Sequence, residues 1–243
     1  EWYWRIFLKL SSKPPVFVFQ MGKVGSSTVY FSLKKHLKRQ FIVHSHDFSP
    51  RHRRHTKVRA LYKHFTVNPN AKLKIITLVR DPIGRNLSGF FQEYEDYVGR
   101  PFKHGELNHE ELKQIFLEQY NHRAPLDWMD RLMTHFGIDV YAEPILPKHF
   151  KHYKAGNSEC LLMRHDLDNK IKEKLIQEYL AIPSLQVENF NESIRHLYGA
   201  AYRDFKQRLV LPKSYLDMML QSKYYKHFYS AEEIRIHLSK WSE

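Results

Sequence analysis

The sequence predicts an α/β protein built around a doubly wound, parallel central sheet. Three short runs of β-branched and aromatic residues, at 16–20, 41–46 and 73–79, have the composition of buried strands. Helical patterns follow these runs, and this alternation is typical of parallel sheets covered by helices on both faces. The chain has no internal repeat, low-complexity tract or linker rich in Pro, Gly and Ser, so we expect one domain over residues 1–243.

The elements follow from local patterns in chain order. Residues 1–13 are aromatic and basic, and we expect a short helix or arm docked on the sheet edge. The helix expected over 26–39 places its apolar residues on one face and its lysines on the other. The segment 51–65, RHRRHTKVRALYKHF, is a very basic helical stretch. It is either a solvated face or a wall for an acidic acceptor.

The second half of the chain predicts a hairpin among helices. Residues 145–168 have a turn signal at Ala155-Gly156-Asn157, and we expect the second strand, Cys160 to Met163, to join the central sheet. Asp139 to Tyr141 is a candidate short strand. The remaining helices are expected at about 83–98, 106–121, 125–135, 168–180, 191–208, 212–221 and 231–240.

The charge balance favours an anionic partner. The 243 residues include 39 Lys and Arg against 26 Asp and Glu, a formal charge of +13, and 16 His. Nucleic acid, a membrane surface, an anionic nucleotide and an acidic polysaccharide all fit this balance. Because the basic residues are spread along the chain and form no recognised nucleic-acid motif, we do not expect nucleic acid as a partner.

Cysteine content and hydropathy give little information about the cellular compartment of the protein. Cys160 is the single cysteine, so the chain has no internal disulfide. No run of about 18 apolar residues exists, and we expect no membrane-spanning helix. The chain opens with EWYWRIFLKL, without an initiating Met or a signal-peptide pattern, so we expect a fragment or a processed chain. We expect a cytoplasmic location, with a missing N-terminal anchor as the open alternative.

The most informative stretch is FVFQMGKVGSSTVY, residues 17–30, which predicts a strand, a tight loop and a helix start. Gly22 and Gly25 bracket Lys23, and hydroxyl residues follow at the helix start, where they can cap free N–H groups. Unpaired N–H groups and the positive end of the helix dipole then point at one place, to which Lys23 adds a full charge. This pattern predicts a pocket for a phosphate-like anion.

The loop departs from the usual nucleoside-triphosphate pattern, in which the lysine comes directly after the last glycine. Here Lys23 precedes Gly25, and hydroxyl residues stand in place of Gly-Lys. The pattern resembles the 5′-phosphosulfate loop of sulfotransferases that use 3′-phosphoadenosine-5′-phosphosulfate (PAPS). The resemblance implies that Lys23 reaches the sulfate and its bridging oxygen. It also implies a set of nucleotide-binding loop residues: Lys23, Val24, Gly25, Ser26, Ser27 and Thr28.

A second motif, RDPIGRNLSGFF at 80–91, follows the third predicted strand. Arg80 stands at the carboxyl end of that strand, where ligands gather in open α/β sheets, and Ser88 lies eight residues further on. An arginine fork and a hydroxyl can bind one phosphate together. This pair resembles the sulfotransferase motif that holds the 3′-phosphate of the nucleotide, and we expect Ser88 about one turn into the following helix.

The wider resemblance is to PAPS-dependent sulfotransferases of the bacterial capsular-polysaccharide or carbohydrate type. It covers most of residues 15–241 and includes PLDWMDRLMTHFGIDVY, ECLLMRHDLD and SKYYKHFYSAEEI. It implies a P-loop NTPase-like three-layer sandwich with a central parallel sheet flanked by helices. The chain lacks the C-terminal R-K-G-x-x-G-x-W of cytosolic sulfotransferases. Two roles stay open for Phe228, Tyr229 and Ser230: a clamp on the nucleotide, or packing under the last helix.

Sulfuryl transfer requires a base for the acceptor hydroxyl, and the carboxyl end of the second strand supplies two candidates. His44 and His46 lie there on the same face of the strand, beside the first strand. The resemblance implies a catalytic His or Glu in this region, and we prefer His46 because it is nearer the strand end. Asp47 could orient or replace the imidazole. Weaker alternatives for the base are Asp127, Asp130 and Glu93.

Together these features predict an enzyme that transfers the sulfuryl group from PAPS to a hydroxyl or amine, on a carbohydrate acceptor, and leaves the 3′,5′-bisphosphate product PAP. Lys23 would stabilise the leaving phosphate. No metal is expected, because the leaving group has no β- and γ-phosphates for Mg²⁺ to bridge. The alternative is a non-catalytic nucleotide- or glycan-binding module on the same fold. A P-loop kinase is disfavoured by the missing Gly-Lys-[Ser/Thr].

Overall fold

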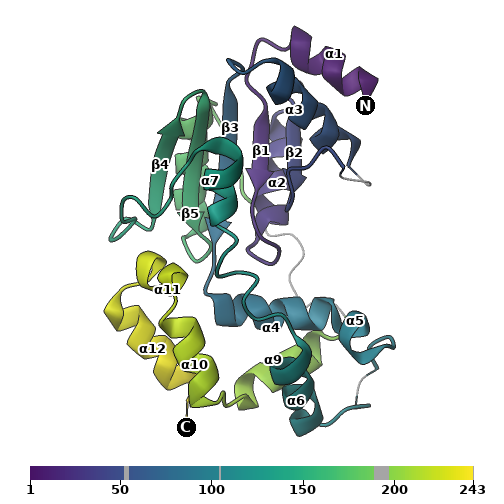
Figure 1. Cartoon of the computed structure of the whole chain (residues 1–243), viewed down its shortest axis with the longest axis vertical. Helices are drawn as coiled ribbons and strands as arrows, with labels where there is room; N and C mark the ends of the chain where they lie inside the picture. The colour runs from purple at the N-terminus through teal and green to yellow at the C-terminus, as the bar shows by residue number, and fades with distance from the viewer. Residues whose placement is uncertain (52–54, 104, 189–196, 243) are drawn as a thin grey trace. The chain divides into compact units, whose positions relative to one another are not determined.

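The computed structural model describes residues 1–51, 55–103, 105–188 and 197–242 and confirms a mixed α/β fold (Figure 1). Its five-stranded sheet has the order β2-β1-β3-β5-β4 and is mainly parallel, with helices flanking it. The strands are β1 (Val16–Phe19), β2 (Ile42–Ser45), β3 (Leu73–Val79), β4 (Phe150–Ala155) and β5 (Ser158–Arg164). The finer P-loop NTPase-like class stays a prediction.

The chain forms two compact units, each assembled from two separate stretches. The first comprises Glu1–Val79 and Met129–Phe190 and contains the whole sheet. The second comprises Arg80–Trp128 and Asn191–Glu243, and its described elements are helices. The interpretation of the sequence as one domain stays a prediction.

The helices divide between the units. The first unit contains α1 (Trp2–Leu10), α2 (Ser26–His36), α3 (Thr56–Val67), α7 (Asp130–Phe136) and α8 (Asn169–Leu180). The second contains α4 (Pro82–Gln92), α5 (Tyr94–Val98), α6 (His109–Gln119), α9 (Gly199–Arg208), α10 (Lys213–Leu220), α11 (Lys223–Phe228) and α12 (Ala231–Trp241). None of the described helices is both long and apolar enough to cross a membrane.

In the first unit, α7 and α2 cover opposite faces of the sheet (Figure 1). Phe19 points to one face, where its ring centroid lies 5.5 Å from that of Phe136 in α7. Val18 precedes it in β1 and points to the other face, because side chains alternate along a strand. His44 of β2 pairs in register with Val18 and shares that face, and its ring lies 5.4 Å from that of Tyr30 in α2.

Four parallel strands bring their carboxyl ends to one edge of the sheet. β1 pairs in parallel with β2 and β3, and β3 with β5. Three segments therefore leave the same edge: the loop Gln20–Gly25 after β1, His46 after β2, and His165 after β5. In an open α/β sheet this is the edge where ligands bind.

The predicted hairpin is confirmed, and its second strand joins the sheet as expected. β4 and β5 pair antiparallel, and Ala155 faces Ser158 across a two-residue turn in which Gly156 has φ 54°. Glycine adopts this left-handed conformation at little cost, which explains the residue choice. The strand is longer than predicted, because it begins at Ser158 and ends at Arg164.

Other predicted elements differ in the structure. The single helix expected over 83–98 is two helices, α4 and α5, which meet at Glu93. Residues 139–141 form no strand, and a turn begins at Val140. The predicted 51–65 segment corresponds to α3, while its residues 52–54, like 191–196 of another predicted helix, lie outside the described residues. The sequence patterns do not predict α11.

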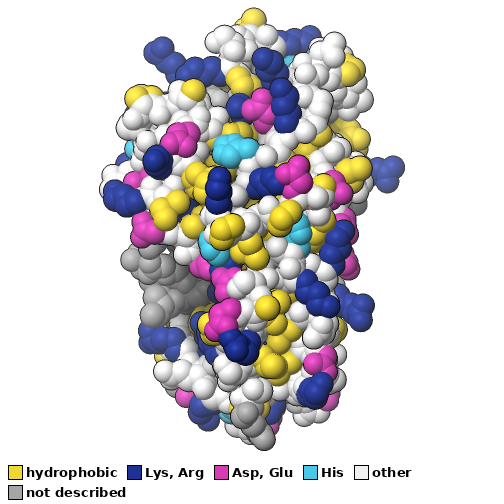
Figure 2. All heavy atoms as spheres, turned by 90° about the vertical axis from the view of Figure 1, so that its left-hand side faces the viewer, with side chains coloured by type: hydrophobic (Ala, Val, Ile, Leu, Met, Phe, Trp, Pro, Cys, Tyr) yellow, Lys and Arg dark blue, Asp and Glu magenta, His cyan; other side chains and the backbone are white. Residues whose placement is uncertain are grey.

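The second unit is built around α4, most of whose residues are buried. Its Phe90 and Phe91 rings contact aromatic rings of α6 and α9, among them Phe116 at 5.4 Å and Phe205 at 5.5 Å. Aromatic rings from three helices therefore pack together in the core of this unit. On the face of the molecule in Figure 2, Lys and Arg side chains are interspersed with Asp and Glu.

Candidate functional site

The loop between β1 and α2 is tight and contains two residues with a left-handed backbone. Lys23 has φ 69° and Gly25 has φ 80°. Val24 between them is fully buried and ties the loop to the core. The left-handed region costs a residue with a side chain about 1 kcal/mol, so the packing of Val24 must hold Lys23 there. Such strain is concentrated at ligand sites in proteins.

The helix start predicted at Ser26 is confirmed. Ser26 is buried at the first position of α2, with Ser27 and Thr28 after it, and Gly25 is the N-cap, which has no side chain to cap the helix. The first turn of this helix contains no acidic residue. Its N–H groups and helix dipole therefore present partial positive charge, and Lys23 adds a full one. The arrangement suits an anion.

His165, which the sequence analysis did not select, lies against this loop. A Cβ built on Gly25 would be 2.9 Å from His165 Cδ2 and 3.3 Å from its Nε2, so the imidazole packs on the glycine. The His165 N–H donates to the carbonyl of Val79 (2.7 Å), and its own carbonyl accepts from Lys172 Nζ (2.6 Å). These bonds fix His165 just beyond β5. Its place directly after a strand was the signal available in the sequence.

His44 and His46 come together at the end of β2, beside the start of the loop. Their ring centroids are 5.1 Å apart, with planes at 89°. Gln20, the first residue after β1, contacts both. Its side-chain Nε2 lies 3.2 Å from His44 Nε2, and its backbone O lies 2.7 Å from His46 Nδ1. The prediction that the two strands are neighbours is confirmed, and it places both histidines next to the lysine loop.

Gln20 makes the two imidazoles chemically different. A carbonyl oxygen can only accept, so His46 Nδ1 carries a proton, and the lone pair of the neutral ring is on Nε2. An amide N–H of Gln20 donates to His44 Nε2, which occupies the lone pair of that ring. Burial, reinforced by repulsion from His46, lowers the pKa of His44 to about 4. His44 is therefore neutral at pH 7 and a weak base, whereas His46 is exposed.

The carboxylates considered as alternative bases have other surroundings. Asp47 lies 4.0 Å from the guanidinium of Arg131, which also donates to the backbone O of His46 at 3.2 Å. Asp130 is exposed at the start of α7. Glu93 and Asp127 belong to the second unit. Of these four carboxylates, Asp47 is next to His46 in the chain and contacts the same arginine, Arg131.

The second motif begins where β3 ends, and a tyrosine fixes its backbone. The N–H of Arg80 donates to the hydroxyl of Tyr224 at 3.2 Å, and that hydroxyl donates to the carbonyl of Arg80 at 3.0 Å. Tyr224 is fully buried in α11. No local sequence pattern indicates this role, because Tyr224 lies far along the chain in α11, a helix that the sequence does not predict.

Residues after Arg80 explain why the sequence reads Asp-Pro-x-Gly. Asp81 is the N-cap of α4 and accepts from the N–H of Gly84 at 2.7 Å. Pro82 occupies the first helical position, where its missing N–H costs nothing. Ser88 is buried in α4, nearly two turns from Pro82 and not one turn as expected.

Further cations gather around Arg80 within the second unit. The pKa of Lys240 is lowered, first by partial burial and then by repulsion from Lys206 and Arg80. Lys240 also lies over the ring of Trp241, with its ammonium 4.9 Å from the ring centroid. Burial is the largest cause of this lower pKa, and the Asp81 carboxylate acts against the two cations by raising it. No sequence pattern links Lys206 or Lys240 to the Arg80 motif.

Packing and capping account for the residues considered as a nucleotide clamp. Phe228 is fully buried, with its ring 4.8 Å from that of Tyr224. Tyr229 is buried, and its ring lies 4.9 Å from that of Tyr225. Ser230 forms a capping box at the start of α12, in which it accepts from the N–H of Glu233 at 3.2 Å.

The structure thus holds the predicted site residues in two groups. Residues 23–28, His44 and His46 belong to the first unit, together with His165. Arg80 and Ser88 belong to the second. In the part of the chain that the structure describes, no group of three or more His, Cys, Asp and Glu side chains is placed to hold a metal ion. Searches against protein-family models, curated proteins and solved structures found no match to this chain.

Proposed function

We propose that this chain is a sulfotransferase that binds PAPS and transfers its sulfuryl group to a hydroxyl or amine of a carbohydrate acceptor. The proposal starts from the resemblance of two motifs, at residues 22–28 and 80–88, to the two phosphate-binding motifs of that family. The P-loop NTPase-like class is part of the same proposal. The five-stranded, mainly parallel sheet supports it at the coarser level of the α/β fold.

One observation carries the proposal: Gln20 connects a candidate base to the lysine loop. Its backbone carbonyl fixes the tautomer of His46, and the chain then runs directly into the loop that holds Lys23. A proton acceptor and a cation are thus supplied from the ends of two neighbouring parallel strands. Group transfer from an anionic donor to a hydroxyl requires this combination of groups.

Two features of the loop fit a bound donor and its acceptor. The first turn of α2 contains no acidic residue, so its backbone N–H groups and helix dipole present partial positive charge to an anion. Gln20 Oε1 is buried and has no hydrogen-bond partner among the described residues, and such orphaned atoms call for an explanation. A hydroxyl of the acceptor could donate to it.

Each residue then has a defined task. Bound PAPS would supply the sulfuryl group that is transferred. The N–H groups of residues 25–28 hold its 5′-phosphate, and Lys23 neutralises the charge that develops on the bridging oxygen. His46 Nε2 accepts the proton of the acceptor hydroxyl, while its Nδ1–H stays bonded to Gln20. The resemblance assigns the 3′-phosphate to Arg80 and Ser88.

Binding is tested by isothermal titration with adenosine 3′,5′-bisphosphate, with AMP as the control ligand. We expect the bisphosphate to bind more tightly than AMP, and ATP with Mg²⁺ to compete poorly. Arg80→Ala and Lys23→Met should each weaken binding by about 2 kcal/mol, because each removes a charged hydrogen bond. Lys34→Met, an exposed lysine later in α2, is the matched control. Equal binding of AMP and the bisphosphate would refute the proposed donor.

Transfer is tested separately with labelled PAPS and a panel of oligosaccharides. His46→Gln should lower kcat by about 10²- to 10⁴-fold, the usual contribution of a general base, and leave bisphosphate binding unchanged. His44→Gln should have a much smaller effect on kcat. Tight bisphosphate binding with no transfer to any acceptor in the panel would favour the alternative, a non-catalytic binding module.

A further inference from the structure

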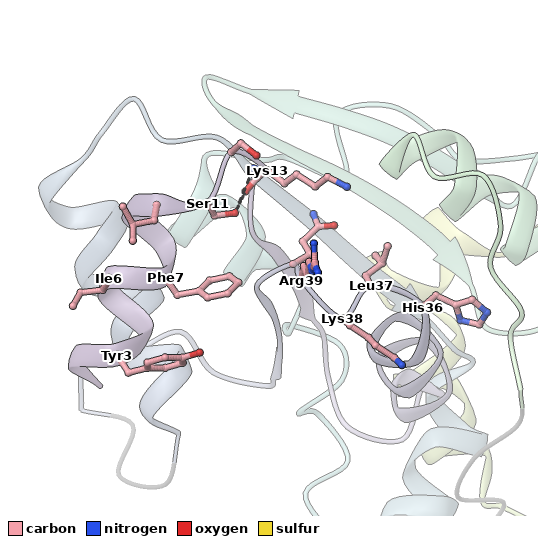
Figure 3. Close-up of a pocket in the computed structure, with 12 residues that line it drawn as sticks. Tyr3, Ile6, Phe7, Ser11, Lys13, His36, Leu37, Lys38 and Arg39 are labelled. Atoms are coloured by element: carbon pink, nitrogen blue, oxygen red, sulfur yellow. Dashed lines mark hydrogen bonds between the residues drawn. The ribbon is translucent and has the colours of Figure 1, made fainter.

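A groove unrelated to the nucleotide motifs lies between α1 and the segment that follows α2. It has a volume of about 790 Å³ and belongs entirely to the first unit. Figure 3 shows Tyr3 and Phe7 pointing from α1 toward the residues at and beyond the end of α2, among them Lys38 and Arg39. Its lining residues are Tyr3, Ile6, Phe7, Leu10, Ser11, Ser12, Lys13, His36, Leu37, Lys38, Arg39 and Gln40.

The inner face of α1 is already occupied. Trp4 packs edge-on against Phe41 with ring centroids 5.9 Å apart, and the ammonium of Lys57 lies 4.0 Å from the Trp4 ring. Glu1 forms an ion pair with Arg59 of α3 at 2.9 Å. These contacts fix α1 on the unit. The opposite, outer face of α1 is therefore the one that faces the groove and solvent.

The outer face of α1 is an apolar stripe at helical spacing. Trp2, Ile6 and Leu10 follow one another every four residues, and Tyr3 and Phe7 lie beside them. Trp2 is 75% exposed, Tyr3 61% and Leu10 80%, an unusual exposure for large apolar side chains in one short helix. Clustered exposure of this kind marks an interaction surface.

The chemistry of the groove selects an anionic partner. Lys13, Lys38 and Arg39 line it together with His36, and no acidic residue is among its lining residues. Arg5 and Lys9 are exposed on the same helix as the apolar stripe. An apolar, aromatic stripe bordered by basic side chains is the pattern of a helix that lies in the interface of an anionic bilayer.

We propose that α1 and its groove dock on the surface of an anionic phospholipid membrane. Trp2, Tyr3 and Leu10 enter the headgroup–acyl boundary, and Lys38 and Arg39 bind lipid phosphates at the groove rim. All charged side chains that line the groove are basic. An anionic surface explains this charge, whereas a neutral peptide or a second copy of the chain does not. The proposal is independent of the nucleotide site.

The experiment is flotation of the chain with phosphatidylcholine vesicles and with vesicles containing 30% phosphatidylglycerol. We expect binding to the anionic vesicles, weakened by added salt, and little binding to the neutral ones. Lys38→Glu with Arg39→Glu should lower the partition coefficient at least 25-fold, because each lost basic residue lowers it about fivefold. Tyr3→Ser with Leu10→Ser should lower it at least tenfold.

Two control variants match these changes. Lys170→Glu with Lys174→Glu makes the same change in net charge on α8, and Val67→Ser with Met133→Ser removes apolar side chains that are 61% and 55% exposed. Both should bind vesicles as the parent chain does, and thermal melting checks that all variants fold. Equal binding to neutral and anionic vesicles, or equal losses in test and control variants, overturns the proposal. A dimer in light scattering that Tyr3→Ser with Leu10→Ser abolishes would assign the groove to a second copy and also overturn it.

Discussion

Replacing Gly25 by Ala tests the geometry of the loop most directly. The backbone there has φ 80°, which costs a residue with a Cβ about 1 kcal/mol. The new Cβ would also lie 2.9 Å from His165 Cδ2, so the imidazole must move. The backbone of His165 is held at both its N–H and its carbonyl, so rotation of the side chain is the available relief. Such overpacking costs a further 1–3 kcal/mol, about 2–4 kcal/mol in all.

A second glycine isolates the contact from the backbone strain. Gly156 has φ 54° and no heavy atom within 4 Å of a Cβ built on it, so Gly156→Ala carries the strain without the clash. Urea denaturation should therefore show Gly25→Ala about 1–3 kcal/mol less stable than Gly156→Ala. In a His165→Ala background the two substitutions should cost the same, as a double-mutant cycle requires. Equal costs in the parent chain would refute the packing of His165 on the loop.

Three further substitutions test other parts of the site. Tyr224→Phe removes the hydroxyl bonded to both backbone groups of Arg80, and urea denaturation should show a loss of about 1–2 kcal/mol together with weaker bisphosphate binding in titration. Gly84→Ala puts a Cβ 2.6 Å from Asp81 Oδ2, and loss of that N-cap should lower stability by about 1–2 kcal/mol in the same assay. His44, whose pKa falls from 6.5 to about 4 on folding, binds its proton more readily in the unfolded state. Stability should therefore fall by about 3 kcal/mol as the pH drops from 6.5 to 4, and denaturation of His44→Gln should show a smaller dependence.

The strands and the lysine loop could be predicted from the sequence because their signals are local. Val16–Phe19 and Leu73–Val79 are apolar runs buried on both faces, as parallel strands are. The loop between Gly22 and Gly25 could be predicted because glycine tolerates backbone conformations that other residues rarely adopt. These strands and this loop depend on a few adjacent residues, and here the sequence and the structure agree.

The remaining features depend on contacts between distant parts of the chain. Tyr224 reaches the backbone of Arg80 across 144 residues, and no local pattern marks the partner of a main-chain hydrogen bond. His165 was visible as a residue after a strand, but its contact with Gly25 depends on the order in which the strands pair. The break at Glu93 lies in a stretch whose composition favours a continuous helix. Tertiary packing decides such features.

The pair of histidines shows how one backbone carbonyl can assign chemical roles that spacing leaves equal. In the sequence His44 and His46 share a face and differ only in distance from the strand end. In the structure Gln20 accepts the Nδ1 proton of His46 through its carbonyl, and donates its amide to His44 Nε2. The first bond keeps a proton on Nδ1 of an exposed ring, and the second occupies the lone pair of a half-buried ring. If sulfuryl transfer needs a base here, the geometry favours His46, and His44, with a pKa of about 4, serves better as a neutral support that positions Gln20.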